Sequence, residues 1–346
     1  MSGPLPDRLL VTGGAGFIGS NFVRRVLERH PDVRVTVLDK LTYAGNLANL
    51  TAVEGDERYA FVEGDIADAA LVDTLAAEVD AIVNFAAESH VDRSIEEPDA
   101  FIRTDVYGTF VLLEAARRHG HTRYLQISTD EVYGNVPEGS STEDDPPRPR
   151  SPYAASKAGG DHFVAAYHTT YGLPTLLTRA SNNFGPYQYP EKIIPLFITN
   201  AIDDQPLPLY GDGQQIRDWL YVDDHCDALE LVLAQGIPGE TYNVGGGNEL
   251  TNLSLTRTIL ELLDKPMTLV RRVEDRPGHD RRYSVDCSKL RRLGWKPAHT
   301  FAEALRATVD WYLAREDWWR PLKSGEYLDY YRRQYAGRLE DGTAVE

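Results

Sequence analysis

Apolar residues form short runs that alternate with amphipathic stretches from residue 8 to about residue 180. A short apolar run bounded by turn residues is typical of a strand that is buried on both faces of a sheet. The stretches between the runs repeat their apolar residues every three or four positions, which indicates helices. The pattern predicts strands at 8–12, 33–39, 59–65, 80–89, 123–130 and 173–180, and helices at 21–30, 71–79, 101–120 and 153–172.

Strands alternating with helices predict an α/β fold with a doubly wound, parallel Rossmann sheet. The alternation weakens near residue 185, where prolines become frequent. We therefore expect a dinucleotide-binding Rossmann domain with the catalytic residues at 1–185, followed by a smaller mixed substrate lobe at 186–335. The chain is expected to cross back to the first domain within the second. The tail at 336–346 is predicted to be disordered.

Composition narrows the possible partners. The chain has 346 residues, 42% of them hydrophobic, and a formal net charge of −17, which argues against a nucleic-acid or anionic membrane surface. Its two cysteines, Cys226 and Cys287, lie far apart without a CxxC pattern, so we expect no metal site and a reduced, cytoplasmic location. No apolar run approaches the roughly 20 residues of a membrane span, and the N-terminus lacks a signal-peptide pattern.

The first strand, turn and helix carry glycines in the spacing GxxGxxG, at Gly13, Gly16 and Gly19. Such glycines permit a tight turn and let the backbone approach a pyrophosphate, which then faces the positive end of the helix dipole. Asp39 ends the second strand, where a carboxylate binds ribose hydroxyls and repels a 2′-phosphate. The pattern favours NAD over NADP, although Lys40 adjoins the acid. A purely structural turn is the alternative.

Further cofactor contacts are expected where the next strands end. Asp65 and Ile66 follow the third strand, at the expected position of an adenine edge, although Asp65 is equally placed to cap a helix. The segment from Ala86 to Ser89, which includes Glu88, follows the fourth strand and would lie over the middle of the cofactor.

Tyr153 and Lys157 are four residues apart in YAASK, which places both on one face of the predicted helix. A nearby ammonium group lowers the pKa of a phenol, so the pair predicts a base that removes a proton from an alcohol. The same lysine is placed to hold the ribose of a nicotinamide.

An acid pair, Asp130 and Glu131, ends the fifth strand in STDEVYG, between Thr129 and Tyr133. Two adjacent carboxyls at the ligand-binding edge of a parallel sheet are suited to act as one acid and one base if their pKa values are pushed apart. Alternatively, the pair caps a helix or faces solvent.

The motifs GGAGFIG, STDEVYG and SPYAASKAGGD together resemble the extended short-chain dehydrogenases/reductases. With AAESHVDRSI and DRPGHDRRY, the chain is similar to the dTDP-glucose 4,6-dehydratases from about Leu9 to about Tyr335. The resemblance implies NAD as a recycled cofactor and a nucleotide-diphosphate sugar as the substrate of the second lobe. It further implies a homodimer joined by the helices that begin near Phe101 and Ala154.

The resemblance implies a lyase reaction in three stages at one sugar. Tyr153 takes the 4-hydroxyl proton while the C4 hydride goes to NAD, and Thr129 bonds the 4-oxygen. Glu131 then removes the C5 proton and Asp130 protonates the leaving 6-hydroxyl. The hydride finally returns to C6 and C5 is reprotonated, giving the 4-keto-6-deoxy sugar for deoxysugar biosynthesis.

The resemblance extends both sets of binding residues. Thr104 and Asn183 join the cofactor residues, which are Gly13, Gly16, Phe17, Ile18, Gly19, Asp39, Lys40, Leu41, Thr42, Asp65, Ile66, Ala86, Ala87, Ser89, Thr104, Tyr153, Lys157 and Asn183. Two arginines are expected on the diphosphate because a guanidinium matches phosphate oxygens. The predicted substrate residues are Ser89, Thr129, Glu131, Asn182, Lys192, Leu196, Pro208, Tyr210, Arg217, Asn252, Arg276 and His279.

One position departs from the family. Many relatives carry Asn where this chain has Asp105, and the extra charge makes this residue the weakest point of the analogy. We expect activity to survive. Two other functions remain open: another nucleotide-sugar enzyme, such as a UDP-sugar 4,6-dehydratase, 4-epimerase or decarboxylase, and a dinucleotide-sensing regulator without chemistry. An epimerase carries small hydroxyl residues in place of the acid pair, and a regulator would have a damaged YxxxK or acid pair.

Overall fold

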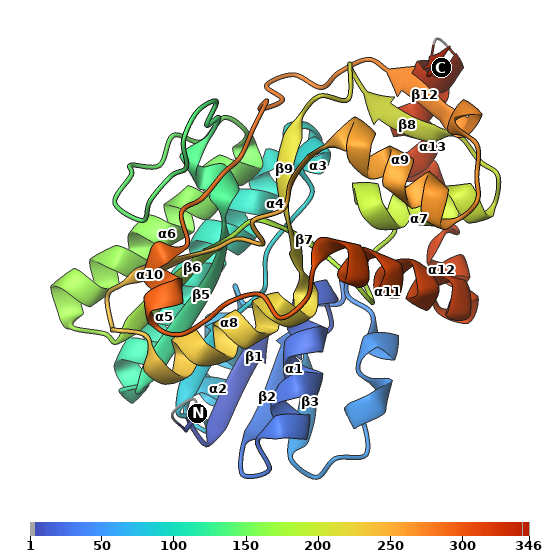
Figure 1. The fold of residues 1–346 in the computed structure, drawn as a ribbon. Coiled ribbons are helices and arrows are strands. Elements are labelled where there is room, and N and C mark those ends of the chain that lie inside the picture. The colour runs from blue at the N-terminus through green and yellow to red at the C-terminus, as the bar shows by residue number, and fades with distance from the viewer. Residues whose placement is uncertain (1–3, 341, 346) are drawn as a thin grey trace.

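The structure is a computed structural model that describes residues 4–340 and 342–345. Its largest sheet has seven strands, all parallel, in the order β10-β6-β5-β4-β1-β2-β3 (Figure 1). These strands are β1 (Arg8–Thr12), β2 (Arg34–Asp39), β3 (Tyr59–Glu63), β4 (Ala81–Asn84), β5 (Arg123–Thr129), β6 (Thr175–Ala180) and β10 (Thr241–Val244). The order reverses at β1, which confirms the predicted doubly wound Rossmann sheet.

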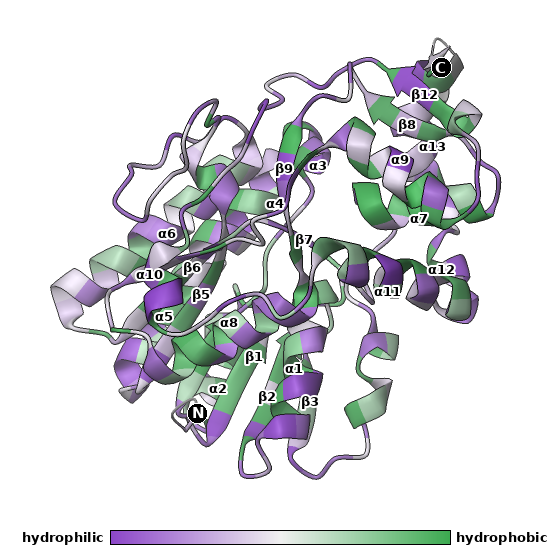
Figure 2. Cartoon of the chain, viewed as in Figure 1, coloured by the Kyte–Doolittle hydropathy of each residue, from purple (hydrophilic) through white to green (hydrophobic). Residues whose placement is uncertain are grey.

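Alternate residues of each strand enter different halves of the core. Leu9 and Val11 pack with Phe22 beneath α1, whereas Leu10 packs with Leu112 and Tyr124 on the opposite face. Helices cover both faces, so strands such as β1 and β2 are apolar over most of their length, as Figure 2 shows. Helices α1 (Phe17–Arg29) and α8 (Val222–Gln235) lie on one face, and α2 (Ala69–Ala76), α5 (Thr109–His119) and α6 (Pro152–Tyr171) on the other.

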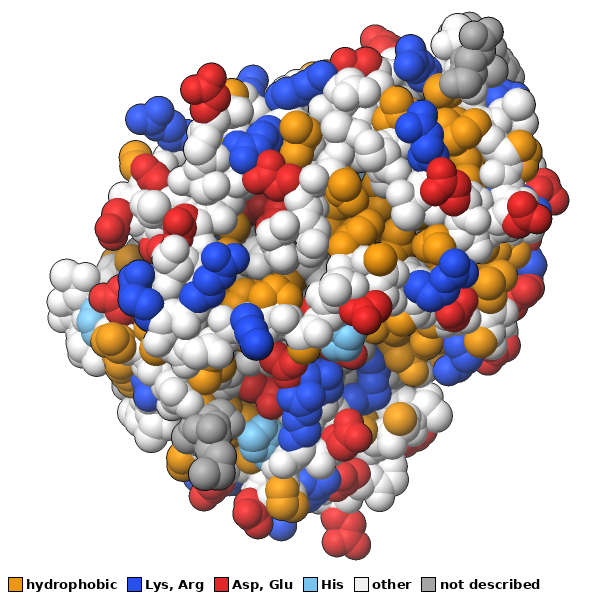
Figure 3. All heavy atoms as spheres, viewed as in Figure 1, with side chains coloured by type: hydrophobic (Ala, Val, Ile, Leu, Met, Phe, Trp, Pro, Cys, Tyr) orange, Lys and Arg blue, Asp and Glu red, His pale blue; other side chains and the backbone are white. Residues whose placement is uncertain are grey.

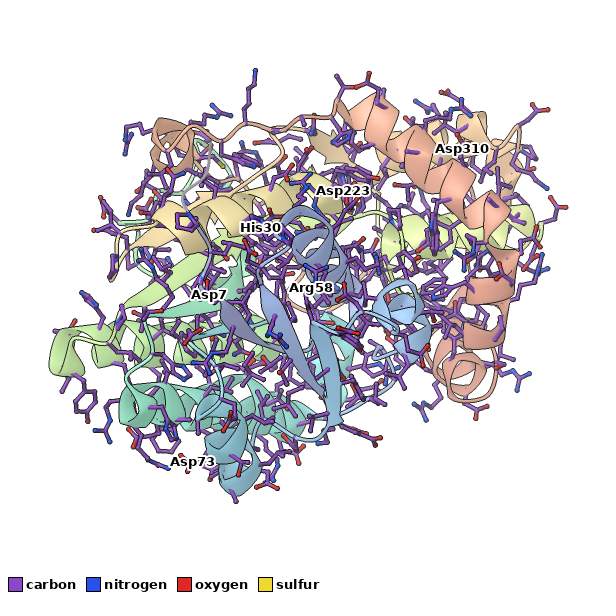
Figure 4. The ribbon with its side chains drawn as sticks, turned by 90° about the horizontal axis from the view of Figure 1, so that it is seen from below. Asp7, His30, Arg58, Asp73, Asp223 and Asp310 are labelled. Atoms are coloured by element: carbon purple, nitrogen blue, oxygen red, sulfur yellow. The ribbon has the colours of Figure 1, made fainter. Side chains whose placement is uncertain are left out.

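The chain returns to the large sheet after building part of the second lobe. β10 pairs with β6 at the edge of the sheet, and α8 packs against α1. Arg25 of α1 reaches Asp223 at 3.4 Å, and His30 reaches Glu230 at 3.1 Å, which ties the late helix to the early one. Figure 4 labels His30 and Asp223 on these neighbouring helices. The boundary near residue 185 stays a prediction.

The second lobe contains two small sheets with helices around them. One sheet has the order β11-β9-β7 and the other β13-β12-β8. Its elements are β7 (Asn182–Phe184), α7 (Ile193–Ile202), β8 (Leu207–Tyr210), β9 (Ile216–Tyr221), β11 (Glu249–Thr251), α9 (Asn252–Leu262), β12 (Val270–Val273), α11 (Phe301–Ala314), α12 (Glu316–Leu322), α13 (Glu326–Glu340) and β13 (Thr343–Ala344). Apolar side chains gather on the surface around α9 and α11, while both signs of charge are mixed elsewhere on this face (Figure 3).

The strand predicted at 80–89 is shorter in the structure, where β4 ends at Asn84, and two further predicted elements differ from those observed. Residues 336–340 continue α13, and β13 pairs antiparallel with β12, so the prediction of a disordered tail is wrong for these residues. Residues 341 and 346 lie outside the described part of the chain. The aromatic residues Tyr327, Tyr330 and Tyr335 of α13 are buried, which explains why the segment is held.

The third difference lies in the predicted helix at 101–120. It begins as α4 (Pro98–Phe101), passes through one π-helical segment, η3 (Ile102–Gly108), and continues as α5. Single π segments inside α-helices frequently occur at functional sites. The remaining short elements are η1 (Leu47–Asn49), η2 (Thr51–Val53), α3 (Val91–Glu96), η4 (Asp130–Tyr133), η5 (Met267–Leu269) and α10 (Ser288–Arg292). Within the described residues, no helix is long and apolar enough to cross a membrane.

Candidate active site

A cavity of about 430 Å³ lies where the carboxyl ends of the parallel strands meet the second lobe. Ligands of open α/β sheets bind at this edge. Every residue predicted to bind cofactor or substrate, or to act in catalysis, lines the cavity, with the exception of Leu41. The backbone N–H of Leu41 instead donates to Asp39 at 2.9 Å. The structure thus brings together residues that are more than 260 positions apart in the sequence.

The glycine turn is shaped so that side chains are excluded from it. Gly13 has φ 68°, and a Cβ there would lie 2.5 Å from the backbone nitrogen of Ala86. A Cβ at Gly19 would lie 2.3 Å from the carbonyl oxygen of Gly13. Gly16 caps α1 without any side-chain hydrogen bond, so the first N–H groups of the helix face the cavity. This cradle fits the pyrophosphate of a dinucleotide.

Asp39 is held in a fixed orientation at the end of β2. One carboxyl oxygen accepts from the backbone N–H of Ala15 and the other from that of Leu41, both at 2.9 Å. Burial raises the pKa of the Asp39 carboxyl. Lys40 turns away to bind Asp65 at 2.9 Å, so it does not offer a free ammonium to a 2′-phosphate. This arrangement fits the ribose of NAD.

Asp65 is not the helix cap considered from the sequence, because the N-cap of α2 is Asp68; its contact with the cofactor stays a prediction. It lines the cavity, and it also accepts from the backbone N–H of Ala67 at 2.8 Å as a turn cap. Burial raises the pKa of Asp65, but the hydrogen bonds from Lys40 and Ala67 and the charges of Lys40 and Arg103 together outweigh it, so the pKa is lowered.

Tyr153 and Lys157 lie one turn apart on α6 and both line the cavity. The Lys157 ammonium donates to the carbonyl oxygen of Ile127 at 2.8 Å. Burial, followed by the charges of Glu131 and Asp105, raises the pKa of the Tyr153 phenol well above its usual value. The expected effect of Lys157 on this pKa stays a prediction. The hydrogen bond with Thr129 acts in the opposite direction to burial: it lowers the pKa of the phenol and so favours the phenolate.

The two neighbouring acids, Asp130 and Glu131, have different surroundings. Asp130 is almost fully buried, and burial followed by the charge of Glu131 raises its pKa well above the usual value. Its Oδ2 has no hydrogen-bond partner among the described residues. Glu131 is less buried, and its Oε2 accepts from the Tyr283 hydroxyl at 3.4 Å. One protonated and one ionised carboxyl are what an elimination requires.

Asp105 sits in the π segment η3 and is 2% exposed. Its Oδ1 accepts from the backbone N–H of Glu88 at 3.1 Å, and its Oδ2 lies 2.5 Å from the Ser156 hydroxyl. Burial raises its pKa to about 7, against the opposing charge of Lys157. When protonated, Asp105 can donate to Ser156, which then donates to the carbonyl oxygen of Tyr153 at 2.8 Å. A neutral Asp105 can thus donate a hydrogen bond, as the asparagine implied by the family resemblance would.

Two arginines line the far end of the cavity. Arg217 is 5% exposed and donates to the backbone carbonyls of Ile216 and Asp280. Within the described residues it forms no ion pair, although burying an uncompensated charge is unfavourable. Arg276 approaches Asp92 at 3.4 Å, and its Nε has no hydrogen-bond partner in the described part of the chain. Two buried guanidinium groups, one without an ion pair and one with an unpartnered Nε among the described residues, indicate an anionic ligand.

The remaining predicted substrate residues line the same cavity as the arginines and the acid pair. The side-chain oxygens of Asn182 and Asn252 are buried without partners among the described residues, so both amides can accept from a ligand. Lys192 is bound to the carbonyl oxygen of Ser89 at 2.6 Å and therefore supports the site rather than offering a free charge. The cavity also contacts Leu196, Pro208, Tyr210 and His279.

Sequence reasoning missed several residues that line the cavity. Asp92 belongs to the quoted motif AAESHVDRSI but received no role. His225 binds Asn183 at 2.8 Å, and only the fold brings α8 to that position. Tyr335 comes from a segment predicted to lie at the very end of the second lobe. Long-range contacts of this kind leave no local signal.

Comparison with known proteins agrees with this geometry. Residues 10–308 match the sequence model of the family described as GDP-mannose 4,6 dehydratase. The chain is 55% identical over 322 residues to a dTDP-glucose 4,6-dehydratase from Streptomyces niveus, an alignment covering 92% of this chain and 96% of that protein.

Solved structures show the same relationship. DesIV, a dTDP-glucose 4,6-dehydratase from Streptomyces venezuelae with NAD and TYD bound, is 56% identical with a TM-score of 0.90, covering 91% of this chain and 100% of that one. A UDP-glucose 4-epimerase from Thermus thermophilus in complex with NAD is 34% identical with a TM-score of 0.83, covering 89% and 99%. The resemblance expected from the motifs is confirmed. The chain belongs to the nucleotide-sugar 4,6-dehydratase family and, within it, to the dTDP-glucose 4,6-dehydratases.

Proposed function

We propose that this protein converts dTDP-glucose to dTDP-4-keto-6-deoxyglucose with NAD as a recycled cofactor. The observation that carries the proposal is the acid pair: Asp130 is buried with a raised pKa beside the less buried Glu131, at the edge of the sheet that also presents Tyr153. The close similarity to dTDP-glucose 4,6-dehydratases supports the same activity.

In the proposed reaction, NAD takes up the C4 hydrogen as hydride and later supplies it to C6. Tyr153 removes the 4-hydroxyl proton, assisted by its hydrogen bond with Thr129. Lys157 donates to the Ile127 carbonyl and lines the same cavity as Tyr153, so we assign to its positive charge the stabilisation of the developing alkoxide.

The resulting 4-ketone acidifies the C5 hydrogen, so a carboxylate can remove that proton. We assign this step to Glu131, whose orientation is supported by the hydroxyl of Tyr283. Burial favours the protonated form of Asp130, and we assign to it the proton that goes to the leaving 6-hydroxyl. When the hydride returns to C6, C5 takes back a proton. Adjacent residues therefore act at adjacent carbons, which avoids moving the sugar between steps.

A related UDP-sugar enzyme is the second candidate. The Thermus epimerase has the same fold at 34% identity, so the fold alone does not distinguish a dehydratase from an epimerase. A 4-epimerase has no use for a buried carboxylic acid beside a carboxylate. The Asp130–Glu131 environment therefore favours dehydration, whereas the choice of dTDP over UDP is supported by the relatives.

The test is to incubate the purified protein with dTDP-glucose or UDP-glucose, without added NAD. Mass spectrometry of the sugar nucleotide should show loss of one water with dTDP-glucose, and the product should absorb in alkali. Turnover without added NAD indicates that the protein retains and recycles its cofactor. An unchanged mass, with either substrate and with NAD supplied, would contradict the proposal.

We further propose a cytoplasmic homodimer. The two cysteines are both buried and free, in keeping with a reducing compartment. Tyr107 and Phe163 are 46% and 39% exposed on η3 and α6, and Phe110 lies between them, 5.9 Å from one ring centroid and 6.2 Å from the other. An exposed aromatic cluster on two neighbouring helices suits a contact with a second copy of the chain.

A further inference from the structure

The C-terminal helix α13 reaches the nucleotide end of the cavity. Tyr335 lines the cavity and is buried, with its ring centroid 6.1 Å from that of Tyr210. Gln334, the residue before Tyr335, is also largely buried, with 9% of its surface exposed. In Figure 1, α13 lies beside β8 and β12, on the lobe opposite the glycine turn.

Gln334 connects this helix to two groups of the cavity. Its Nε2 donates to the Tyr210 hydroxyl oxygen at 2.7 Å and to Asp92 Oδ2 at 3.1 Å. Tyr210 donates in turn to the same Asp92 oxygen at 3.2 Å, and Arg338 donates to the Tyr210 hydroxyl at 3.2 Å. A tyrosine with three polar partners keeps one ring orientation.

The other Asp92 oxygen holds Arg276. Their closest approach is 3.4 Å; Arg276 lines the cavity, and its buried Nε has no hydrogen-bond partner among the described residues. Asp92 is buried and belongs to α3, which starts just after the segment 86–89 of the cofactor side. One carboxylate thus links an arginine, an aromatic ring and the C-terminal helix across three separate parts of the chain.

We propose that α13 is part of the nucleotide-binding site, with Tyr335 as a wall and Gln334 and Asp92 as positioning residues for Tyr210 and Arg276. This inference rests on the proposed function, since it takes the ligand of this end to be the nucleoside diphosphate. Binding of that ligand orders Tyr210 and Arg276, and through Asp92 and Gln334 it stabilises α13 on the lobe. The reverse also holds: loosening α13 weakens nucleotide binding.

The experiment measures binding of dTDP by calorimetry to the full-length protein and to Gln334→Ala. Loss of a buried hydrogen bond to a charged group should weaken dTDP binding about tenfold. Retention of NAD should not change, because the cofactor residues lie at the other end of the cavity. Arg333→Ala, an exposed neighbour on the same helix, is the matched control and should bind dTDP as the wild type does.

Hydrogen exchange on the wild-type protein gives a second readout that needs no variant. Addition of dTDP should slow amide exchange within 327–339, whereas addition of NAD should leave these amides unchanged. Equal dTDP affinity in Gln334→Ala and wild type, or α13 amides that do not respond to dTDP, would overturn the inference. Failure of the wild type to bind dTDP at all would instead contradict the proposed function.

Discussion

Two buried carboxyls show how position alone decides what an acid can do. Asp130 and Asp105 are both nearly inaccessible to water, and burial raises the pKa of each. Asp130 has an oxygen without a partner among the described residues and faces the cavity, as a proton donor must. Asp105 has both oxygens bonded and supports the helix that carries Tyr153. The sequence located both residues but did not reveal this difference.

The division of labour in the acid pair is testable by removing the base. Glu131→Gln should still oxidise C4 and accumulate reduced cofactor, whereas elimination should slow by roughly 10²–10⁴-fold, the usual contribution of a general base. Single-turnover absorbance of the reduced nicotinamide, with mass spectrometry of the sugar, separates the two steps. Water loss at nearly the wild-type rate would remove Glu131 from the role of base.

The neutral form of Asp105 predicts a pH-dependent stability. The unfolded carboxyl ionises around its ordinary pKa of 3.8, whereas the folded one holds its proton until about pH 7. The folded state binds more protons in this window, so the free energy of unfolding should fall as pH rises from about 4 to 7. In Asp105→Asn this loss should be absent, which makes the variant more stable above pH 7, by on the order of 4 kcal/mol at most.

Urea denaturation between pH 5 and pH 8 measures this difference. Asp310→Asn is a suitable control, because Asp310 is exposed on α11 (Figure 4). Parallel pH profiles for wild type and Asp105→Asn would show that Asp105 is ionised in the folded protein at all these pH values.

At the scale of elements, the apolar pattern predicted the large sheet well because its strands are covered on both faces. It could not predict the π segment η3, since one extra residue in a helical turn leaves the apolar spacing almost unchanged. Nor could it predict α13, whose buried face is made of tyrosines rather than aliphatic residues. The glycine turn was predicted from the spacing of its glycines. The structure shows why glycine is needed there: a Cβ at Gly13 or Gly19 would collide with the backbone.

Gly13→Ala tests that steric reason against a matched position. Gly13 and Gly120 have nearly equal φ values of 68° and 66°, but a Cβ at Gly120 meets nothing within 4 Å. Gly120→Ala should therefore lose only about 1 kcal/mol of stability from the left-handed backbone. Gly13→Ala should lose clearly more and should no longer retain NAD. Thermal unfolding and the NAD content of the purified proteins measure both effects, and similar values in the two variants would contradict the steric account.

On the scale of the whole molecule, the site depends on contacts that span the chain. The cavity is lined from Gly13 to Tyr335, and α8 is tied back onto α1 by charged pairs. Local patterns predicted the residues at strand ends because topology brings those ends together. They did not predict His225 or Gln334, because only tertiary packing places α8 and α13 against the cavity. Most of the site residues predicted in the second lobe came from the family resemblance and not from the periodicity of apolar residues.

The proposed dimer is also a property of the whole molecule. Tyr107→Glu places a charge within the exposed aromatic cluster of η3 and α6 and should convert dimers to monomers in analytical ultracentrifugation. Leu313→Glu introduces the same charge at an exposed apolar residue of α11 and should leave the dimer intact. A monomeric wild-type protein, or a Tyr107→Glu variant that stays dimeric, would rule out this surface as the interface.

The most direct test of the central claim follows one hydrogen through the reaction. We would supply dTDP-glucose with deuterium at C4, without added NAD, and locate the label in the product by NMR. If one site oxidises, eliminates and reduces the same sugar, the product has lost one water and carries the deuterium at C6. Deuterium returned to C4 with no loss of water would instead identify an epimerase, and would contradict the role assigned to Asp130 and Glu131.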